Sequence, residues 1–405
     1  MEKIKIQTHP RETFLYATSR MLERIAYYGI RAIIILYMVS ESVKMDESEA
    51  FNIYSWLATS VLFSQIIGAL LGDLLIGNRK SVIIGGVLQA LGAFSFCIPS
   101  TIGLYIGLFL VVLGGGFYTP NIISNFGKLY LNKTKLLDSG FTLLYTAVNL
   151  GAFAGPLLIG YCGEYFGWSI GFIIAGILIL VSLIPILFIK GNNQSKILAS
   201  DLPIKRRFFT ILIAFVFVGL FWAIYEISNF RIFDLQSKLS EISTLGIPTD
   251  MWSSLNTVFT VPFTLLAIIL WSYFYSTQFF KLMIAFIFGT ISFGILVLIP
   301  ETPNEQHMIL YLVSLFFISV AEIHIIPIIH SILTQYANPK YLAILISLAF
   351  IPTRLFSLIV GLFNEGLHER PVTALIIATV AMTILSIGLI IFNLINKKDD
   401  TVNLD

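Results

Sequence analysis

The hydrophobic pattern of the chain consists of long apolar segments separated by short polar ones. A helix of about 20 apolar residues crosses the hydrocarbon core of a bilayer, and about twelve segments approach that length. Six of them precede a polar connection at 191–207, and six follow it. The predicted helices are 14–39, 51–76, 81–98, 102–127, 139–162, 168–190, 208–232, 252–276, 279–299, 308–336, 341–364 and 371–396.

Lysine and arginine occur in alternate connections between these segments. Lys80, Lys133 and Lys205 lie in basic connections, whereas Glu47 and Glu301 lie in the connections between them. Basic residues stay on the cytoplasmic side of a membrane protein. The pattern therefore predicts a multi-pass protein of the cell (inner) membrane with both termini in the cytoplasm.

The composition agrees with a bilayer environment. Hydrophobic residues make up 57% of the chain and charged residues 12%, whereas soluble domains have about 25% charged residues. The net charge of +2 does not suggest nucleic acid as a partner, and the two cysteines lack the spacing of a metal site. No nucleophile elbow or phosphate loop is present. We expect no enzyme activity, no metal and no cofactor, and the pattern predicts no particular oligomeric state.

The order of the segments predicts an all-α membrane protein with two six-helix bundles, at 1–190 and 208–405, joined by 191–207. This arrangement resembles the major facilitator fold, in which two bundles rock about a site near the midplane of the membrane. The segment Gly68–Lys80 resembles the loop motif of that superfamily. We expect Asp73 and Arg79 in it to form a conformational latch; the alternative is a tight turn with basic residues on the cytoplasmic side.

The first predicted helix carries a stripe of charged and aromatic side chains. Arg20, Arg24, Tyr27 and Arg31 recur at steps of four, three and four, so they share one helical face. Each arginine at a helix centre costs roughly 2.5–3.5 kcal/mol. Glu23 lies one turn from Arg20 and is placed to neutralise part of the stripe. The face should look into a polar interior; the alternative is an internal ion-pair cluster without a substrate role.

Two opposite charges lie near mid-depth in different halves of the chain. Arg24 supplies a cation and Glu322 an anion, an arrangement suited to a zwitterion with separated charges. Asn149 and Asn256 are placed to add neutral hydrogen bonds, although contacts between helices are an equally common use of asparagine. Arg354, beside Pro352, is a further buried cation predicted to neutralise Glu322 or to line the cavity.

A second predicted pair lies closer to the outer face. Arg31 and Glu226 both lie about two-thirds of the way outward along equivalent helices of the two halves. Such a pair would close the outer side when formed, and protonation of Glu226 would release Arg31. The alternative is a static buried ion pair.

Several segments are similar to signatures of the proton-dependent oligopeptide transporter family within the major facilitator superfamily. That resemblance implies proton-coupled symport of di- and tripeptides by alternating access. Arg24 and Tyr28 would hold the peptide carboxylate, with Tyr27 and Trp222 beside the site. Glu322, Asn149 and Asn256 would hold the amino group. Glu23, Arg31 and Glu226 would serve proton coupling and gating, with Glu226 as the protonation site. The similar segments are Leu22–Ala32, Phe117–Tyr130, Asp138–Phe153, Phe221–Glu226 and Glu322–Pro339.

The chain departs from the family signature at several positions. Arg20 stands where the family has a glutamate, Thr119 where it has a lysine, and Leu62 where it has a pocket tyrosine. The first two positions pair in the family, so we expect one salt bridge to be lost and the site to be more positive. Two alternatives follow: transport of another small anionic or acidic compound with altered proton coupling, or a transport-inactive receptor or structural membrane protein.

Overall fold

The computed structural model describes residues 8–189, 202–243, 252, 255–274, 276–352, 355–356, 359, 366–367 and 369–402. This part of the chain is helical and contains no strand. It divides into two compact units, one of Met1–Phe208 with Leu333–Phe350 and one of Phe209–Ile332 with Ile351–Asp405. The two bundles predicted from the sequence, 1–190 and 208–405, meet at the polar connection 191–207. Residues 191–201 of this connection lie outside the described residues, so the predicted boundaries stay a prediction.

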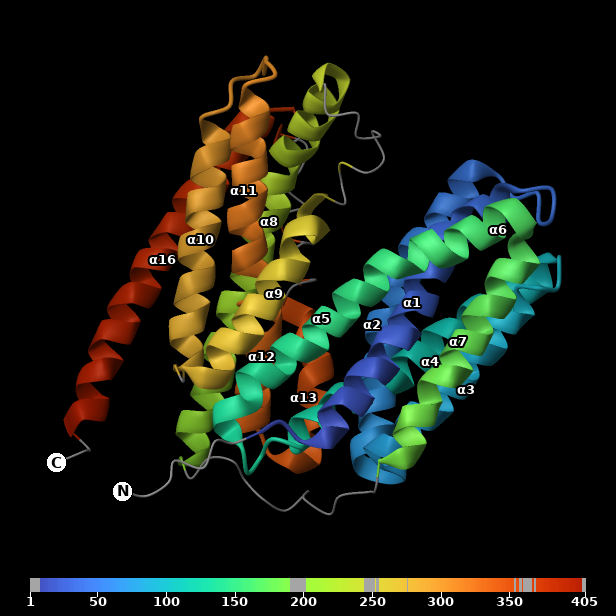
Figure 1. Ribbon diagram of the computed structural model, residues 1–405, viewed down its shortest axis with the longest axis horizontal. Helices are drawn as coiled ribbons and strands as arrows, with labels where there is room; N and C mark the ends of the chain where they lie inside the picture. The colour runs from blue at the N-terminus through green and yellow to red at the C-terminus, as the bar shows by residue number, and fades with distance from the viewer. Residues whose placement is uncertain are drawn as a thin grey trace. The chain divides into compact units, whose positions relative to one another are not determined.

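The first unit contains the helices of the amino-terminal half and a short piece from further along the chain (Figure 1). Its main helices are α1 (Arg11–Val39), α2 (Glu47–Leu71), α3 (Asn78–Ser95), α4 (Thr101–Lys128), α5 (Leu137–Gly155), α6 (Tyr161–Phe166) and α7 (Trp168–Phe188). Shorter helical elements are η1 (Gly72–Ile76), η2 (Thr134–Leu136), η3 (Pro156–Gly160), η6 (Pro339–Tyr341) and α13 (Leu342–Leu348).

The second unit is built on α8 (Ile204–Ile242), α9 (Leu255–Tyr273), α10 (Gln278–Val297), α11 (His307–Glu322) and α16 (Pro371–Val402). α12 (Ile326–Tyr336) begins in this unit and ends in the first. α10 packs against α11 and α16, and α9 packs against α11. The rings of Phe217 and Phe221 on α8 contact Phe286 on α10.

Within the described residues, 8 helices are long and apolar enough to cross a membrane, and shorter apolar helices cover Val258–Tyr273 and Pro339–Pro352. Two predicted helices differ in extent. α8 runs ten residues beyond 232 because Arg231, Asp234 and Lys238 form ion pairs at helical spacing on a polar extension. The segment 308–336 is interrupted after Glu322, where Pro327 lacks the N–H that a continuous helix requires.

Small residues bring the helices of the first unit close together. α1 packs against α5 and α7, and α4 packs against α2 and α3. A Cβ added at Gly68 on α2 would lie 2.3 Å from the carbonyl oxygen of Gly116 on α4. A Cβ at Gly151 on α5 would lie 2.6 Å from the Cβ of Arg24. Close backbone approach of this kind is typical of helix contacts in membranes, and it holds the charged stripe of α1 in place.

Candidate functional site

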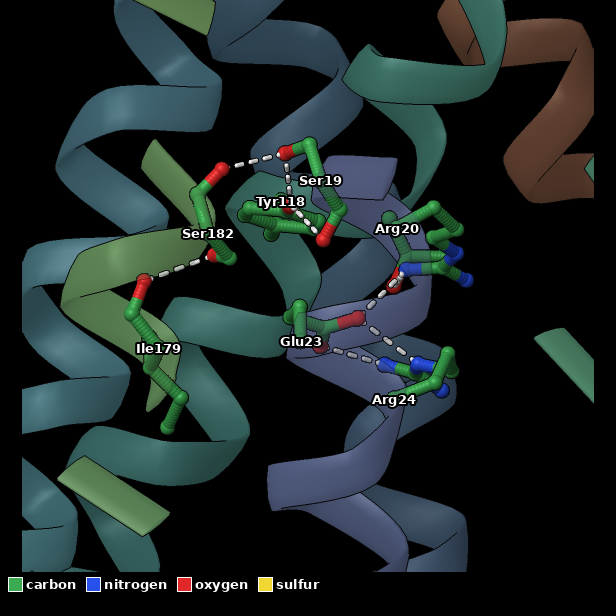
Figure 2. Close-up of polar contacts among 8 residues, drawn as sticks. Ser19, Arg20, Glu23, Arg24, Tyr118, Ile179 and Ser182 are labelled. Carbon is green, nitrogen blue, oxygen red and sulfur yellow. Dashed lines mark hydrogen bonds and ion pairs between the residues drawn. The ribbon is translucent and has the colours of Figure 1, made fainter. Parts of the chain in front are cut away.

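The stripe on α1 folds into a buried ion cluster (Figure 2). Glu23 accepts a hydrogen bond of 3.0 Å from Nη1 of Arg20 and bonds of 2.7 and 2.6 Å from Nε and Nη2 of Arg24. Glu23 is fully buried, and Arg20 and Arg24 are 5% and 8% exposed. The prediction that Glu23 neutralises part of the stripe is confirmed. Two guanidinium groups share one carboxylate, so the three side chains carry an excess of one positive charge.

Aromatic rings complete the surroundings of Arg24. Its guanidinium carbon lies 4.3 Å from the ring centroid of Tyr27 and 5.7 Å from that of Tyr28. Cation–π contacts within about 6 Å are attractive. Because Arg24 and Tyr28 are one turn apart on the same helix, the local sequence alone brings a cation and a hydroxyl to one place. This pair can bind a carboxylate.

Arg20 lies against α4. Its Nη1 donates to the hydroxyl of Thr119 at 3.1 Å, and its guanidinium lies 5.9 Å from the ring of Tyr118. The hydroxyl of Tyr118 bonds to that of Ser19 at 2.7 Å (Figure 2). The expected salt bridge between positions 20 and 119 is replaced by a neutral hydrogen bond. Nε of Arg20 has no hydrogen-bond partner within the described part of the chain.

Arg31 has a partner that the sequence did not reveal. Its Nε and Nη2 donate to the hydroxyl of Tyr54 on α2 at 3.1 and 2.7 Å. The predicted partner, Glu226, lies on α8 in the second unit. The gate between Arg31 and Glu226 therefore stays a prediction, as does the opposition of Arg24 and Glu322.

The second unit contains a buried acid. Glu322, 8% exposed, is the last residue of α11 and accepts a hydrogen bond of 3.0 Å from Nδ2 of Asn256. Ser319, one turn earlier on α11, donates to the side-chain oxygen of Asn256. Tyr225 on α8 is a further hydrogen-bonding neighbour of the carboxylate. This arrangement holds a carboxylate beside neutral donors and can bind an amino group.

The remaining predicted site residues lie on the expected helices. Nδ2 of Asn149 donates to the carbonyl of Tyr145 on its own helix at 3.0 Å. Trp222 is half-buried, with its ring edge-on to Tyr225 at 5.4 Å. Leu62 is half-buried on α2. Arg354 lies outside the described residues.

The predicted pairing of Asp73 with Arg79 is wrong. Asp73 in η1 accepts hydrogen bonds of 2.8 Å from Nδ2 of Asn78 and 2.9 Å from the backbone N–H of Ile344 in α13. Arg79 donates instead to the carbonyl oxygen of Leu187 at 3.0 Å. A carboxylate near the first turn of a helix is stabilised by the exposed N–H groups there, and this interaction competes successfully with an exposed ion pair. Asp73 thus joins η1 to α13, but its partner is a backbone N–H near the start of α13 and not the side chain of Arg79.

Sequence reasoning missed several neighbours of these sites. Ser319 is three residues from Glu322 and shares its face, so helical spacing offered a signal. Tyr54 approaches from another helix and the N–H of Ile344 belongs to the backbone, so no pattern pointed to them. Tyr225 lies in the segment Phe221–Glu226 that resembles the family signature, but nothing in the sequence indicated its contact with Glu322. Within the described ranges, no group of three or more His, Cys, Asp or Glu residues could hold a metal ion.

The sequence matches the Major Facilitator Superfamily over residues 16–361. The chain belongs to this superfamily. A crystal structure of a peptide transporter, POT, shares its fold, with a TM-score of 0.62 and 20% identity over 94% of this chain and 95% of that one. The predicted fold class, an all-α membrane protein with twelve transmembrane helices in two six-helix bundles, is confirmed. The chain is a multi-pass membrane protein of this superfamily.

The chain matches part of the length of its curated relatives. An uncharacterized transporter, YclF, of Bacillus subtilis (strain 168) is 34% identical over 190 residues, which are 46% of this chain and 39% of the relative. A di-/tripeptide transporter of Lactococcus lactis subsp. cremoris is 28% identical over 256 residues, 59% of this chain and 50% of the relative. The matched part thus spans half or less of these relatives. The predicted resemblance to proton-dependent oligopeptide transporters is confirmed.

Proposed function

We propose that this transporter performs proton-coupled symport of di- or tripeptides across the cell membrane by alternating access, with both termini in the cytoplasm. One observation carries the proposal: each unit holds a buried polar site of opposite charge. Arg24 with its two tyrosines suits a carboxylate, and Glu322 with Asn256 suits an amino group. The similarity to di-/tripeptide transporters supports this choice of substrate.

The charged ends of the peptide are assigned to these groups. Arg24 and Tyr28 hold the carboxylate, while Glu322, Asn256 and Asn149 hold the amino group. Tyr27 and Trp222 provide aromatic surface for the rest of the substrate. Glu23 keeps the arginines of α1 aligned, because its two oxygens bind both guanidinium groups.

Proton coupling is assigned to Glu226. An opposite charge favours the ionised form of a carboxylate, so pairing with Arg31 would hold Glu226 ionised and proton binding would break the pair. The guanidinium of Arg31 donates to the hydroxyl of Tyr54. This hydrogen bond would continue to hold Arg31 after its pair with Glu226 breaks. Protonation of Glu226 would thereby become linked to opening.

A second candidate function rests on the excess positive charge around Glu23. Arg20 has an N–H without a partner in the described residues, and the ion cluster lacks a second carboxylate. A substrate with an additional acidic group would supply that charge. Transport of acidic peptides or of another small anionic compound, with altered proton coupling, is the alternative that this geometry favours.

Uptake into proteoliposomes tests both functions. We expect a labelled dipeptide such as Ala-Ala to accumulate when the pH outside is lower than inside. Adding a proton ionophore, which dissipates the gradient, should abolish this accumulation. Faster accumulation of Ala-Glu than of Ala-Ala would favour the acidic alternative. Specific binding without transport would indicate a receptor instead.

The gate has a separate test in Glu226→Gln. This variant should lose gradient-driven accumulation and keep counterflow of preloaded peptide, because the neutral amide mimics the protonated acid. Full accumulation by Glu226→Gln would exclude this residue as the coupling site.

A further inference from the structure

A cavity of ≈ 270 Å³ lies inside the second unit, among α8, α9, α10 and α11. Asn256 lines it on one side, and Tyr311 and Leu315 line it from α11. The volume exceeds that of a cavity of about 150 Å³ that binds benzene, so it has room for one amino-acid side chain. The cavity adjoins the Glu322 site because the side chain of Asn256 that lines the cavity also donates to Glu322.

Two buried donors that line the cavity lack a hydrogen bond of ordinary length to any residue that the structure describes. Trp252, 2% exposed, and Tyr311, fully buried, lie with their rings tilted and the ring centroids 6.0 Å apart. Neither the indole N–H of Trp252 nor the hydroxyl of Tyr311 forms a hydrogen bond of ordinary length within the described residues. Gln236 is a looser polar neighbour of the hydroxyl. Buried polar groups are normally paired, and an unpaired donor calls for an acceptor.

The other lining residues restrict the chemistry of that acceptor. The cavity is lined by aromatic, aliphatic, amide and hydroxyl side chains, and none of the described lining residues is charged. Asn229 and Gln236 add amide groups that both donate and accept. A charged group would be buried here without an opposite charge, which is costly. The cavity therefore suits a neutral group with an oxygen acceptor.

We infer that this cavity is a side-chain subsite, defined by Trp252 and Tyr311, for a neutral, hydrogen-bond-accepting residue at the amino end of the peptide. The inference rests on the proposed function, since the amino group must sit at Glu322 for its own side chain to enter past Asn256. The subsite would then select substrates whose first residue has an uncharged side chain with an acceptor oxygen. Glutamine fits this description, whereas lysine and glutamate do not.

Two variants remove the donors: Tyr311→Phe keeps the same ring, and Trp252→Phe leaves a smaller aromatic ring in place of the indole. Binding of dipeptides to the purified full chain is measured by isothermal titration. Each variant should weaken binding of Gln-Ala about five- to tenfold, as expected for one lost hydrogen bond. Binding of the near-isostere Met-Ala and of the reversed peptide Ala-Gln should stay within twofold of wild type. Wild type should bind Gln-Ala more tightly than Glu-Ala or Lys-Ala.

Trp271→Phe is the matched control. The indole of Trp271 donates to Nε2 of His324 at 3.2 Å, outside the cavity. This variant loses a buried bond, so its melting temperature should fall while its preference among peptides stays that of wild type. Both tryptophan variants replace a buried indole by a smaller ring and lose stability for that reason. The result that distinguishes them is the preference among peptides, which should change in Trp252→Phe and not in Trp271→Phe.

The outcomes separate two failures. Equal weakening of Gln-Ala and Met-Ala in Trp252→Phe and Tyr311→Phe, or no weakening of either, would show that the cavity holds only water and would overturn the subsite alone. If wild type binds no dipeptide, the proposed function fails and the subsite fails with it.

Discussion

The guanidinium of Arg20 on α1 donates a hydrogen bond of 3.1 Å to the hydroxyl of Thr119 on α4. The resemblance to peptide transporters places a glutamate and a lysine at these two positions. Here the two side chains remain in contact, but the ion pair has become a cation bound to a neutral acceptor. Arg20 therefore adds its charge to that of Arg24, and Glu23 alone opposes them.

Restoring the ion pair tests the effect of that charge. In Arg20→Glu/Thr119→Lys, the excess positive charge of the cluster disappears. A charge about 8 Å from a bound carboxylate is worth about 2 kcal/mol at an effective dielectric constant of 20. We expect the preference for Ala-Glu over Ala-Ala in uptake competition to fall by at least tenfold. Arg20→Lys, which keeps the charge, is the control; an equal loss in both variants would argue against a charge effect.

Glu23→Gln should destabilise the first unit strongly. The change leaves two buried guanidinium groups without a counter-charge, and breaking a buried pair typically costs about 3–5 kcal/mol. Thermal unfolding in detergent should show a clear drop in melting temperature. The matched control is Glu41→Gln, which removes the exposed pair with Lys44, where the carboxylate side chain is 93% exposed. Exposed pairs contribute about 0–1 kcal/mol, so a similar drop in both variants would contradict the role of Glu23.

Asp73→Asn should loosen α13. Asn78 and the N–H of Ile344 donate to different oxygens of Asp73, and an amide replaces one of these acceptors by an NH2 group, so one of the two bonds is lost. Loss of one such bond costs about 1–3 kcal/mol, and amide hydrogen exchange in Leu342–Leu348 should accelerate about tenfold. Asp46→Asn provides the comparison, because Asp46 caps α2 through the N–H of Ser48. Asp46→Asn should affect the start of α2 and leave α13 unchanged. Unchanged protection of α13 in Asp73→Asn would show that the bond between Asp73 and Ile344 does not hold α13 in place.

The start of α1 should become less firmly held at low pH. Nδ1 of His9 lies 2.9 Å from the hydroxyl of Tyr130, which also bonds to Thr13 at 2.7 Å. Burial, together with the charge of Lys133, lowers the pKa of His9 below its ordinary value of 6.5. The folded state therefore favours neutral His9. Its contribution to stability is complete above pH 6.5 and is lost as the pH falls toward the lowered pKa.

Hydrogen exchange of residues 8–13 measures this effect. After correction for the intrinsic exchange rate, protection should decrease between pH 7.5 and pH 5. His9→Gln keeps a hydrogen-bonding side chain without a titrating ring, so its protection should not change with pH over that range. The same pH dependence in wild type and His9→Gln would exclude His9 as the cause.

The sequence alone was sufficient to predict the apolar helices, their location in a membrane and the charged face of α1. Apolar length and helical spacing are properties of neighbouring residues, so they place Arg20, Glu23 and Arg24 on one face before any tertiary contact is known. The pairing of Glu23 with both arginines follows from the same local geometry. The extension of α8 past 232 was missed because the apolar pattern ends before the helix does.

Only the tertiary structure decided which partners approach from other helices. Tyr54 reaches Arg31 across a distance in sequence that no periodicity encodes. The resemblance placed Asn256 and Glu322 in one site, but only the structure shows the hydrogen bond between them. The partner of Asp73 is a backbone N–H exposed at the start of α13, and every residue but proline has such a group, so side-chain identity carries no signal for it. The cavity beside Trp252 depends on how four helices pack. Local sequence determines the faces that helices present, whereas packing decides what each face meets.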